Sequence, residues 1–216
     1  MKSNKMKTLE IIDRVTKKVE LAPFPSFTPT HVFMIIEAIG LSAPIGRMKL
    51  SSILQLGEGA TRTLVKRLQK EGIIKSTKFG CVLTDLGKKI FLDLSSRISK
   101  ELEIPPSQYT LGRFNIAILV KNSAKAVGYG VEQRDAAIKA GALGATTLIY
   151  IKDKFVMPGG QEDAFKDLPE IRKMLIERLK PKEGDSIVIG SADDEKSAKL
   201  GAKAAALETL RKALER

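Results

Sequence analysis

Basic and hydrogen-bonding side chains recur at helical spacing between residues 59 and 71 of this chain. With Ala60 set at zero and each residue advanced by 100°, one side of the helical wheel, between about 180° and 300°, holds Arg62, Thr63, Lys66, Gln69 and Lys70. Lysine and arginine contact phosphates, while amides and hydroxyls hydrogen-bond to base edges. The strip therefore has the side chains of a surface that contacts nucleic acid.

The other side of the same wheel is apolar and holds Ala60, Leu64, Val65 and Leu68. A helix of this kind can seat its apolar side on its own domain and present its basic side to the major groove of DNA. Arg67 falls at the border of the apolar side, so we expect it to brace the domain rather than contact DNA.

The flanking elements predict a helix-turn-helix followed by a wing. A short extended piece at residues 45–49 precedes a small helix that starts at Leu50 and is stopped by Gly57. Strands 73–77 and 81–83 are joined at residues 78–80. We predict that the helix at residues 59–71 is the recognition helix and that two lysines of the wing contact phosphates. The predicted DNA-binding residues are Arg62, Thr63, Lys66, Gln69, Lys70, Lys75 and Lys78.

The stretch LVKRLQKEGIIKSTKFGCVLTDLGKKI is similar to the pattern shared by MarR-like and PadR-like winged-helix transcription regulators. The matching positions are Arg67-Leu68, Gly72-Ile73-Ile74 and Leu83-Thr84-Asp85-Leu86-Gly87, and the resemblance covers residues 28–102. The whole chain also resembles an uncharacterised archaeal family of winged-helix regulators whose C-terminal domain has no assigned function. These resemblances imply transcription regulation with double-stranded DNA as the partner. Because the wing turn TKFG is short, we expect phosphate contact rather than deep minor-groove insertion.

The charge of the chain is concentrated around this helix. Lys and Arg number 37 against 25 Asp and Glu, for a formal net charge of +12. Residues 45–90 contain 10 basic and 3 acidic residues, whereas residues 111–216 contain 19 and 15. The uneven excess favours an anionic partner for the first half.

A single cysteine, Cys81, excludes an internal disulfide and a Cys-x-x-Cys metal site, which favours a reducing cytoplasm. No stretch approaches the 18 or so apolar residues of a membrane span. We therefore expect a cytoplasmic protein with no membrane partner.

Two domains are predicted, residues 1–104 and 111–216, separated by a segment with paired prolines. In the first, helices at residues 7–20 and 28–40 flank the proline-rich APFPSFTP, with Thr28 as a helix cap and His31 in the core. A last helix is expected from Thr84 to Leu102, with an apolar residue at every fourth position. Its stripe is longer than a winged domain needs, which predicts a homodimer.

The second domain is predicted to be an α+β sandwich of two layers with a largely antiparallel sheet. Its strands are expected at residues 114–120, 146–151, 154–158 and 185–190, and its helices at 131–140, 168–179 and from 194 onward. A small doubly wound sheet is the alternative.

Two segments of this domain are candidates for binding a small molecule, the first for an anionic effector and the second for hydrogen-bonding a ligand or weakly binding a metal. The first is a glycine-bearing loop and helix N-terminus, a combination that favours anions, with Lys125, Gly128, Gly130, Gln133 and Arg134. The second follows a strand, with Ser191 and Asp193. The alternative for the first segment is that its glycines only form turns and Arg134 pairs with a carboxylate. The alternative for the second segment is that it is only a helix cap.

No catalytic residues, metal ligands or cofactor motif are predicted. The favoured function is a transcription regulator whose second domain senses a ligand or mediates dimerisation. The alternative is a small metabolite enzyme that has a winged helix as an autoregulatory domain.

Overall fold

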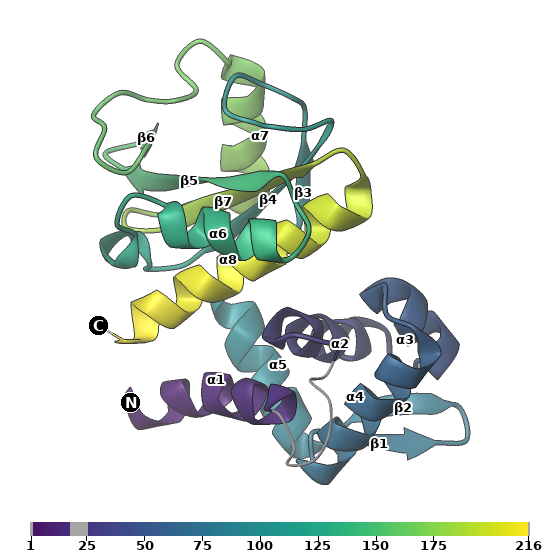
Figure 1. The fold of residues 1–216 in the computed structure, drawn as a ribbon. Helices are drawn as coiled ribbons and strands as arrows, with labels where there is room; N and C mark the ends of the chain where they lie inside the picture. The colour runs from purple at the N-terminus through teal and green to yellow at the C-terminus, as the bar shows by residue number, and fades with distance from the viewer. Residues whose placement is uncertain (1, 18–25, 216) are drawn as a thin grey trace. The chain divides into compact units, whose positions relative to one another are not determined.

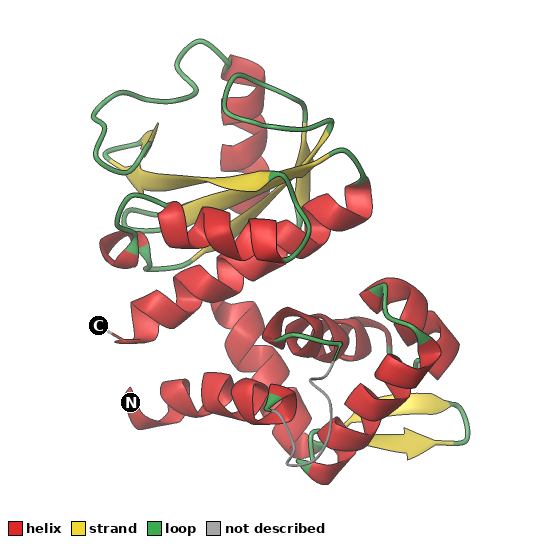
Figure 2. Cartoon of the chain, viewed as in Figure 1, coloured by secondary structure: helices red, strands yellow, loops and turns green. Residues whose placement is uncertain are grey.

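The computed structural model describes residues 2–17 and 26–215, which divide into two compact units, Met1–Ser95 and Ser96–Arg216. Figure 1 gives the element labels used below, and Figure 2 shows that helices predominate in the first unit whereas the second is built on a larger sheet.

The first unit consists of helices followed by a β-hairpin. Its elements are α1 (Lys2–Thr16), α2 (Pro29–Ser42), α3 (Arg47–Leu54), α4 (Glu58–Lys70), β1 (Ile74–Thr77), β2 (Gly80–Leu83) and α5 (Asp85–Arg97). β1 and β2 are antiparallel, and Ile45 exchanges backbone hydrogen bonds with Cys81 on the free edge of β2. The order α2, α3, α4, β1, β2 follows the predicted order of helices and a two-stranded hairpin.

α2 is the central helix of this unit. Val32, Ile35, Ile36 and Ile39 are fully buried along it. At its start, Thr28 precedes Pro29, and the backbone N–H of Thr28 donates to Nδ1 of His31 at 3.1 Å. His31 is buried, as predicted, and it also completes a capping box at the helix N-terminus.

Several boundaries of the first unit differ from the sequence prediction. α3 begins at Arg47, so the extended piece expected at residues 45–49 is only the bridge at Ile45. Helix α1 covers the beginning of the helix expected at 7–20, while residues 18–25, which include Val19 and half of the proline-rich link, lie outside the described residues.

The helix expected to reach Leu102 ends at Arg97 instead. Beyond it, Ser99 N donates to Leu119 O, and Leu102–Ile104 forms strand β3. Apolar residues continue at every fourth position after Arg97, but the backbone there hydrogen-bonds to strand β4 instead of continuing the helix. The long stripe that suggested a dimer is therefore shared between two elements.

The second unit contains a five-stranded sheet of order β3-β4-β7-β5-β6 in which every neighbouring pair is antiparallel. Its remaining elements are β4 (Phe114–Val120), the 3-10 turn η1 (Ala124–Ala126), α6 (Val131–Lys139), β5 (Gly144–Ile151), β6 (Lys154–Val156), α7 (Pro169–Leu179), β7 (Ser186–Ala192) and α8 (Glu195–Glu215). The antiparallel α+β prediction is confirmed, and the doubly wound alternative is wrong.

Helices cover both faces of this sheet, so the unit has three layers and the expected two-layer arrangement is wrong (Figure 1). Ile187 and Ile189 of β7 pack with Ile171 and Leu175 of α7. Gly190, which points the other way, lies so close to α8 that a Cβ there would be 2.3 Å from Ala202 N. All seven residues of β7 are buried because neither face is open to solvent.

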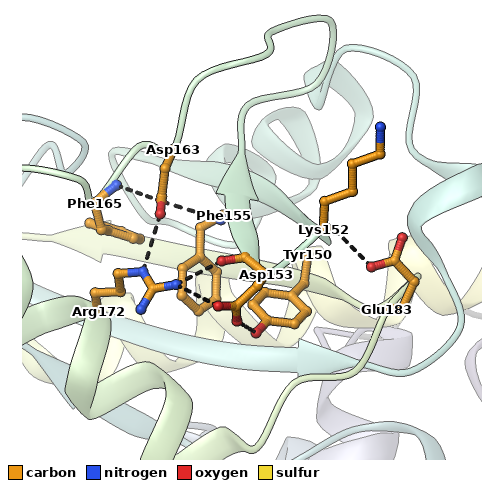
Figure 3. Close-up of polar contacts among 8 residues, drawn as sticks. All are labelled: Tyr150, Lys152, Asp153, Phe155, Asp163, Phe165, Arg172 and Glu183. Carbon is orange, nitrogen blue, oxygen red and sulfur yellow. Dashed lines mark hydrogen bonds and ion pairs between the residues drawn. The ribbon is translucent and has the colours of Figure 1, made fainter.

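A network of charged and aromatic side chains fixes the β5–β6 hairpin and the loop after it (Figure 3). Arg172 Nε donates to Asp163 Oδ2 at 3.1 Å, and Arg172 Nη2 donates to the carbonyl oxygen of Asp153 at 2.7 Å. The Tyr150 hydroxyl donates to Asp153, and this hydrogen bond and burial raise the pKa of Tyr150 to about 12. The network joins α7 to the hairpin on one side of the sheet.

Among the described residues, no helix combines the length and apolar composition needed to cross a bilayer. Within the same residues, no group of three or more His, Cys, Asp or Glu side chains is arranged to hold a metal ion.

Candidate nucleic-acid interface

Helix α4 is seated on the first unit by its apolar side. Leu64 and Leu68 are fully buried, and Thr61 and Val65 are nearly so. Gln55 adopts the left-handed conformation between α3 and α4, which turns the chain in a short connection. The helix predicted at residues 59–71 is confirmed to within one residue at each end.

The opposite side of α4 is open to solvent, as are the two wing lysines. The exposed residues there are Arg62, Thr63, Lys66, Gln69, Lys70, Lys75 and Lys78. In the part of the chain that the structure describes, none of the five basic side chains in this set is paired with a carboxylate. Their charge is therefore available to an anionic partner.

The two polar residues of the strip are partly engaged within the protein. Thr63 Oγ1 donates to Gly59 O at 3.0 Å, one turn back along the helix. Gln69 Nε2 donates to Ser76 Oγ of β1 at 3.0 Å. Gln69 therefore holds the wing to the helix, and its amide oxygen is the group left for a ligand.

Arg67 braces the unit, as expected from its place on the helical wheel. Its Nη1 donates to the carbonyl oxygens of Val15 and Lys17 at 2.8 and 2.7 Å, and its guanidinium lies 5.2 Å from the centre of the Phe27 ring. These contacts fix α4 against the end of α1.

A hollow of about 430 Å³ separates the exposed side of α4 from the wing. Four cationic side chains line it together with polar and apolar neighbours, in the set Gly46, Arg47, Arg62, Val65, Lys66, Gln69, Ser76, Thr77, Lys78, Phe79, Gly80 and Cys81. The sequence prediction missed Arg47, because it started α3 at Leu50, and Phe79, whose ring is 70% exposed and lies 5.0 Å from Lys78 Nζ.

Close backbone approaches hold the wing in place. Gly80 has φ of 135°, and a Cβ there would lie 2.6 Å from the Ile45 carbonyl. A Cβ on Gly87 would lie 2.1 Å from Ile73 O. Thr84 caps α5, as predicted, by accepting a hydrogen bond from Gly87 N at 3.1 Å. The Leu-Thr-Asp-Leu-Gly motif thus packs the start of α5 onto the end of α4.

The predicted effector residues of the second unit do not form one site. Ser191 is fully buried, donates to Asn115 Oδ1 at 2.7 Å, and lies on the α7 side of the sheet with Ile187 and Ile189. Helix α6, with Gln133 and Arg134, covers the opposite face. Because side chains alternate along a strand, no common ligand can touch both groups.

The remaining members of these two candidate segments have local structural roles or lie at the surface. Gln133 is buried, and Arg134 pairs with its neighbour Asp135 at 3.1 Å. Gly130, with φ of 77°, precedes α6 as its N-cap, and Lys125 and Gly128 are exposed.

The segment after β7 is a helix cap. Asp194 accepts a hydrogen bond from Ser197 N at 2.9 Å, and the pKa of Asp194 is lowered chiefly by its hydrogen bonds to Ser197. Asp193 is exposed beside it. The helix cap expected as the alternative for this segment is therefore present.

A solved structure resembles the whole architecture. Hypothetical protein PH0730 from Pyrococcus horikoshii OT3 has 30% sequence identity and a TM-score of 0.67, and the similarity covers 87% of this chain and 100% of that one. The chain belongs to the PH0730-like family. Its residues 34–89 match the PH0730-like N-terminal domain, and residues 111–210 match a domain of unknown function, DUF4443. No curated protein gives a significant match.

The PH0730-like N-terminal domain contains all of α3, α4 and the wing. The candidate interface therefore lies within the segment that matches this N-terminal domain, while the DUF4443 region covers β4 to most of α8.

Proposed function

We propose that this PH0730-like protein is a DNA-binding transcription regulator that places α4 in the major groove. The observation that supports this most strongly is the open basic side of α4, whose other side is fully buried. The major groove is about 12 Å wide and admits one α-helix, so such a helix can reach base edges while its domain stays outside.

Phosphate contacts extend from the helix to the wing. Arg47, Arg62, Lys66 and Lys78 surround the hollow between these elements, and Lys70 and Lys75 lie outside it. A DNA backbone that passes along this surface would neutralise these charges and release counterions. The resemblance to MarR-like and PadR-like regulators supports the same mode of binding.

We assign the second unit to assembly rather than to catalysis. The residues expected to bind an effector lie on both faces of the sheet, so the two segments do not combine into one site. A homodimer would place two copies of α4 on half-sites about one DNA turn apart.

Selection of bound duplexes from a random DNA pool tests the proposal. We expect enrichment of a common sequence with two related half-sites. Arg62→Ala with Lys66→Ala should greatly weaken retention of the selected duplex. Lys154→Ala with Lys166→Ala, which removes the same charge from exposed sites of the second unit, should retain it. Equal retention by both double variants would reject the proposal.

A further inference from the structure

The outer side of α6 is a stripe in which two exposed apolar side chains lie on either side of the ion pair between Arg134 and Asp135. Gln133 and Ala137 point inward and are buried, whereas Val131 and Ile138 are exposed on the opposite side of the helix. These two side chains are seven residues apart, so they lie about 10 Å from one another along the helix axis.

More apolar surface adjoins this stripe. Tyr129, which precedes α6, is 82% exposed. Leu143 follows α6 and is also exposed, and Leu111 lies beside Arg134, since both approach the Cβ position of Gly144 within 3.7 Å. An exposed apolar surface of this kind, bordered by charges, is typical of a protein–protein contact.

The charges at the border are those that a second copy would complement. Glu132 in the first turn and Lys139 in the last turn lie on the same flank of the stripe, and both are exposed. Neither has an ion-pair partner among the described residues. A helix with an acidic start and a basic end is complementary to its own copy in the antiparallel direction.

We propose that α6 of one copy packs antiparallel against α6 of a second copy about a two-fold axis that passes between residues 134 and 135. In this register Val131 faces Ile138 of the second copy. Glu132 lies about 3 Å along the axis from Lys139 of the second copy, within reach of an ion pair. The flanking Tyr129, Leu111 and Leu143 widen the contact toward the roughly 800 Å² per partner of a stable interface.

The inference goes beyond DNA binding and is tested without DNA, by sedimentation of the full chain at micromolar concentration. We expect the wild type to be a dimer and Ile138→Asp to be a monomer with an unchanged circular dichroism spectrum. Leu92→Asp, which alters an exposed leucine of α5, should leave the dimer intact. A monomeric wild type, a dimeric Ile138→Asp variant, or dissociation by Leu92→Asp would each overturn the proposal.

A pair of charge reversals tests the register and does not depend on the behaviour of Ile138→Asp. Glu132→Lys places like charges opposite each other in its homodimer, and so does Lys139→Glu. Each variant alone should dimerise at least tenfold more weakly than the wild type, whereas an equimolar mixture should recover the wild-type affinity. If the mixture dimerises no better than either variant alone, the antiparallel contact is excluded.

Discussion

The side-chain amide of Gln69 donates a 3.0 Å hydrogen bond to the hydroxyl of Ser76, which joins the last turn of α4 to the first strand of the wing. The bond lies at the surface, between two elements that are adjacent in sequence through the turn at Gly72. It holds α4 and the wing together as one surface.

Removal of this hydrogen bond should weaken DNA binding without changing its dependence on salt. A net hydrogen bond contributes about 0.5–1.5 kcal/mol, so we expect Ser76→Ala to lower affinity roughly two- to tenfold. The slope of log affinity against log salt should stay the same because no cation is lost. Fluorescence anisotropy with a labelled duplex measures both quantities, with Ser95→Ala, an exposed serine of α5, as the control. A changed slope would mean that the substitution alters the phosphate contacts of neighbouring cations, which would contradict a purely orienting role for this hydrogen bond.

Gly87 should be indispensable to the first unit. A Cβ there would lie 2.1 Å from Ile73 O, so Gly87→Ala must displace backbone atoms. We expect a loss of about 3 kcal/mol or more in the free energy of unfolding. Gly59→Ala is the matched control, because a Cβ on Gly59 has no atom within 4 Å and alanine favours a helix. Urea denaturation should therefore separate the two variants, and equal stabilities would contradict the close contact.

The first unit should lose stability in mild acid through His31. Burial lowers the pKa of His31 below its usual 6.5, so the unfolded chain takes up a proton before the folded one does. The resulting contribution to stability is full above pH 6.5 and is lost as the pH falls through the folded pKa. Glutamine can accept the same hydrogen bond from Thr28 without titrating. His31→Gln should therefore reduce the fall of the melting temperature as the pH drops below 6.5, and an unchanged fall would contradict the assignment.

The second unit should lose stability in alkali through Tyr150. The pKa of Tyr150 is raised from 10.0 to about 12, foremost by its hydrogen bond to Asp153. A raised pKa gives stability that is complete below pH 10 and is lost between pH 10 and 12. Tyr150→Phe should remove this dependence in thermal melts, whereas Tyr129→Phe, at an exposed tyrosine, should not. The reverse ranking of the two variants would contradict the network of Figure 3.

Strong local patterns made much of this fold predictable. The 3.6-residue period and the bounding glycines placed α4 within one residue, and Lys152-Asp153 located the β5–β6 turn, where both residues have positive φ. The exposed basic residues followed from the same helical wheel. These features depend on nearest neighbours along the chain.

Features that depend on distant partners were missed. Ile98 and Leu102 continue a helical spacing, yet backbone pairing with β4 takes them out of the helix. The continuous apolar runs of β4 and β7 indicate strands buried on both faces. The prediction nevertheless placed all helices on one face and so missed that α7 covers the other. The bond between Gln69 and Ser76 had no signal in the sequence.

The salt dependence of duplex binding tests the central claim most directly. Each phosphate contact contributes about −0.9 to the slope of log affinity against log salt, so about five contacts predict a slope near −4.5. Arg62→Ala with Lys66→Ala should reduce its magnitude by about 1.8. A slope near zero for the wild type, or the same slope for the double variant, would contradict the assignment of α4 to DNA.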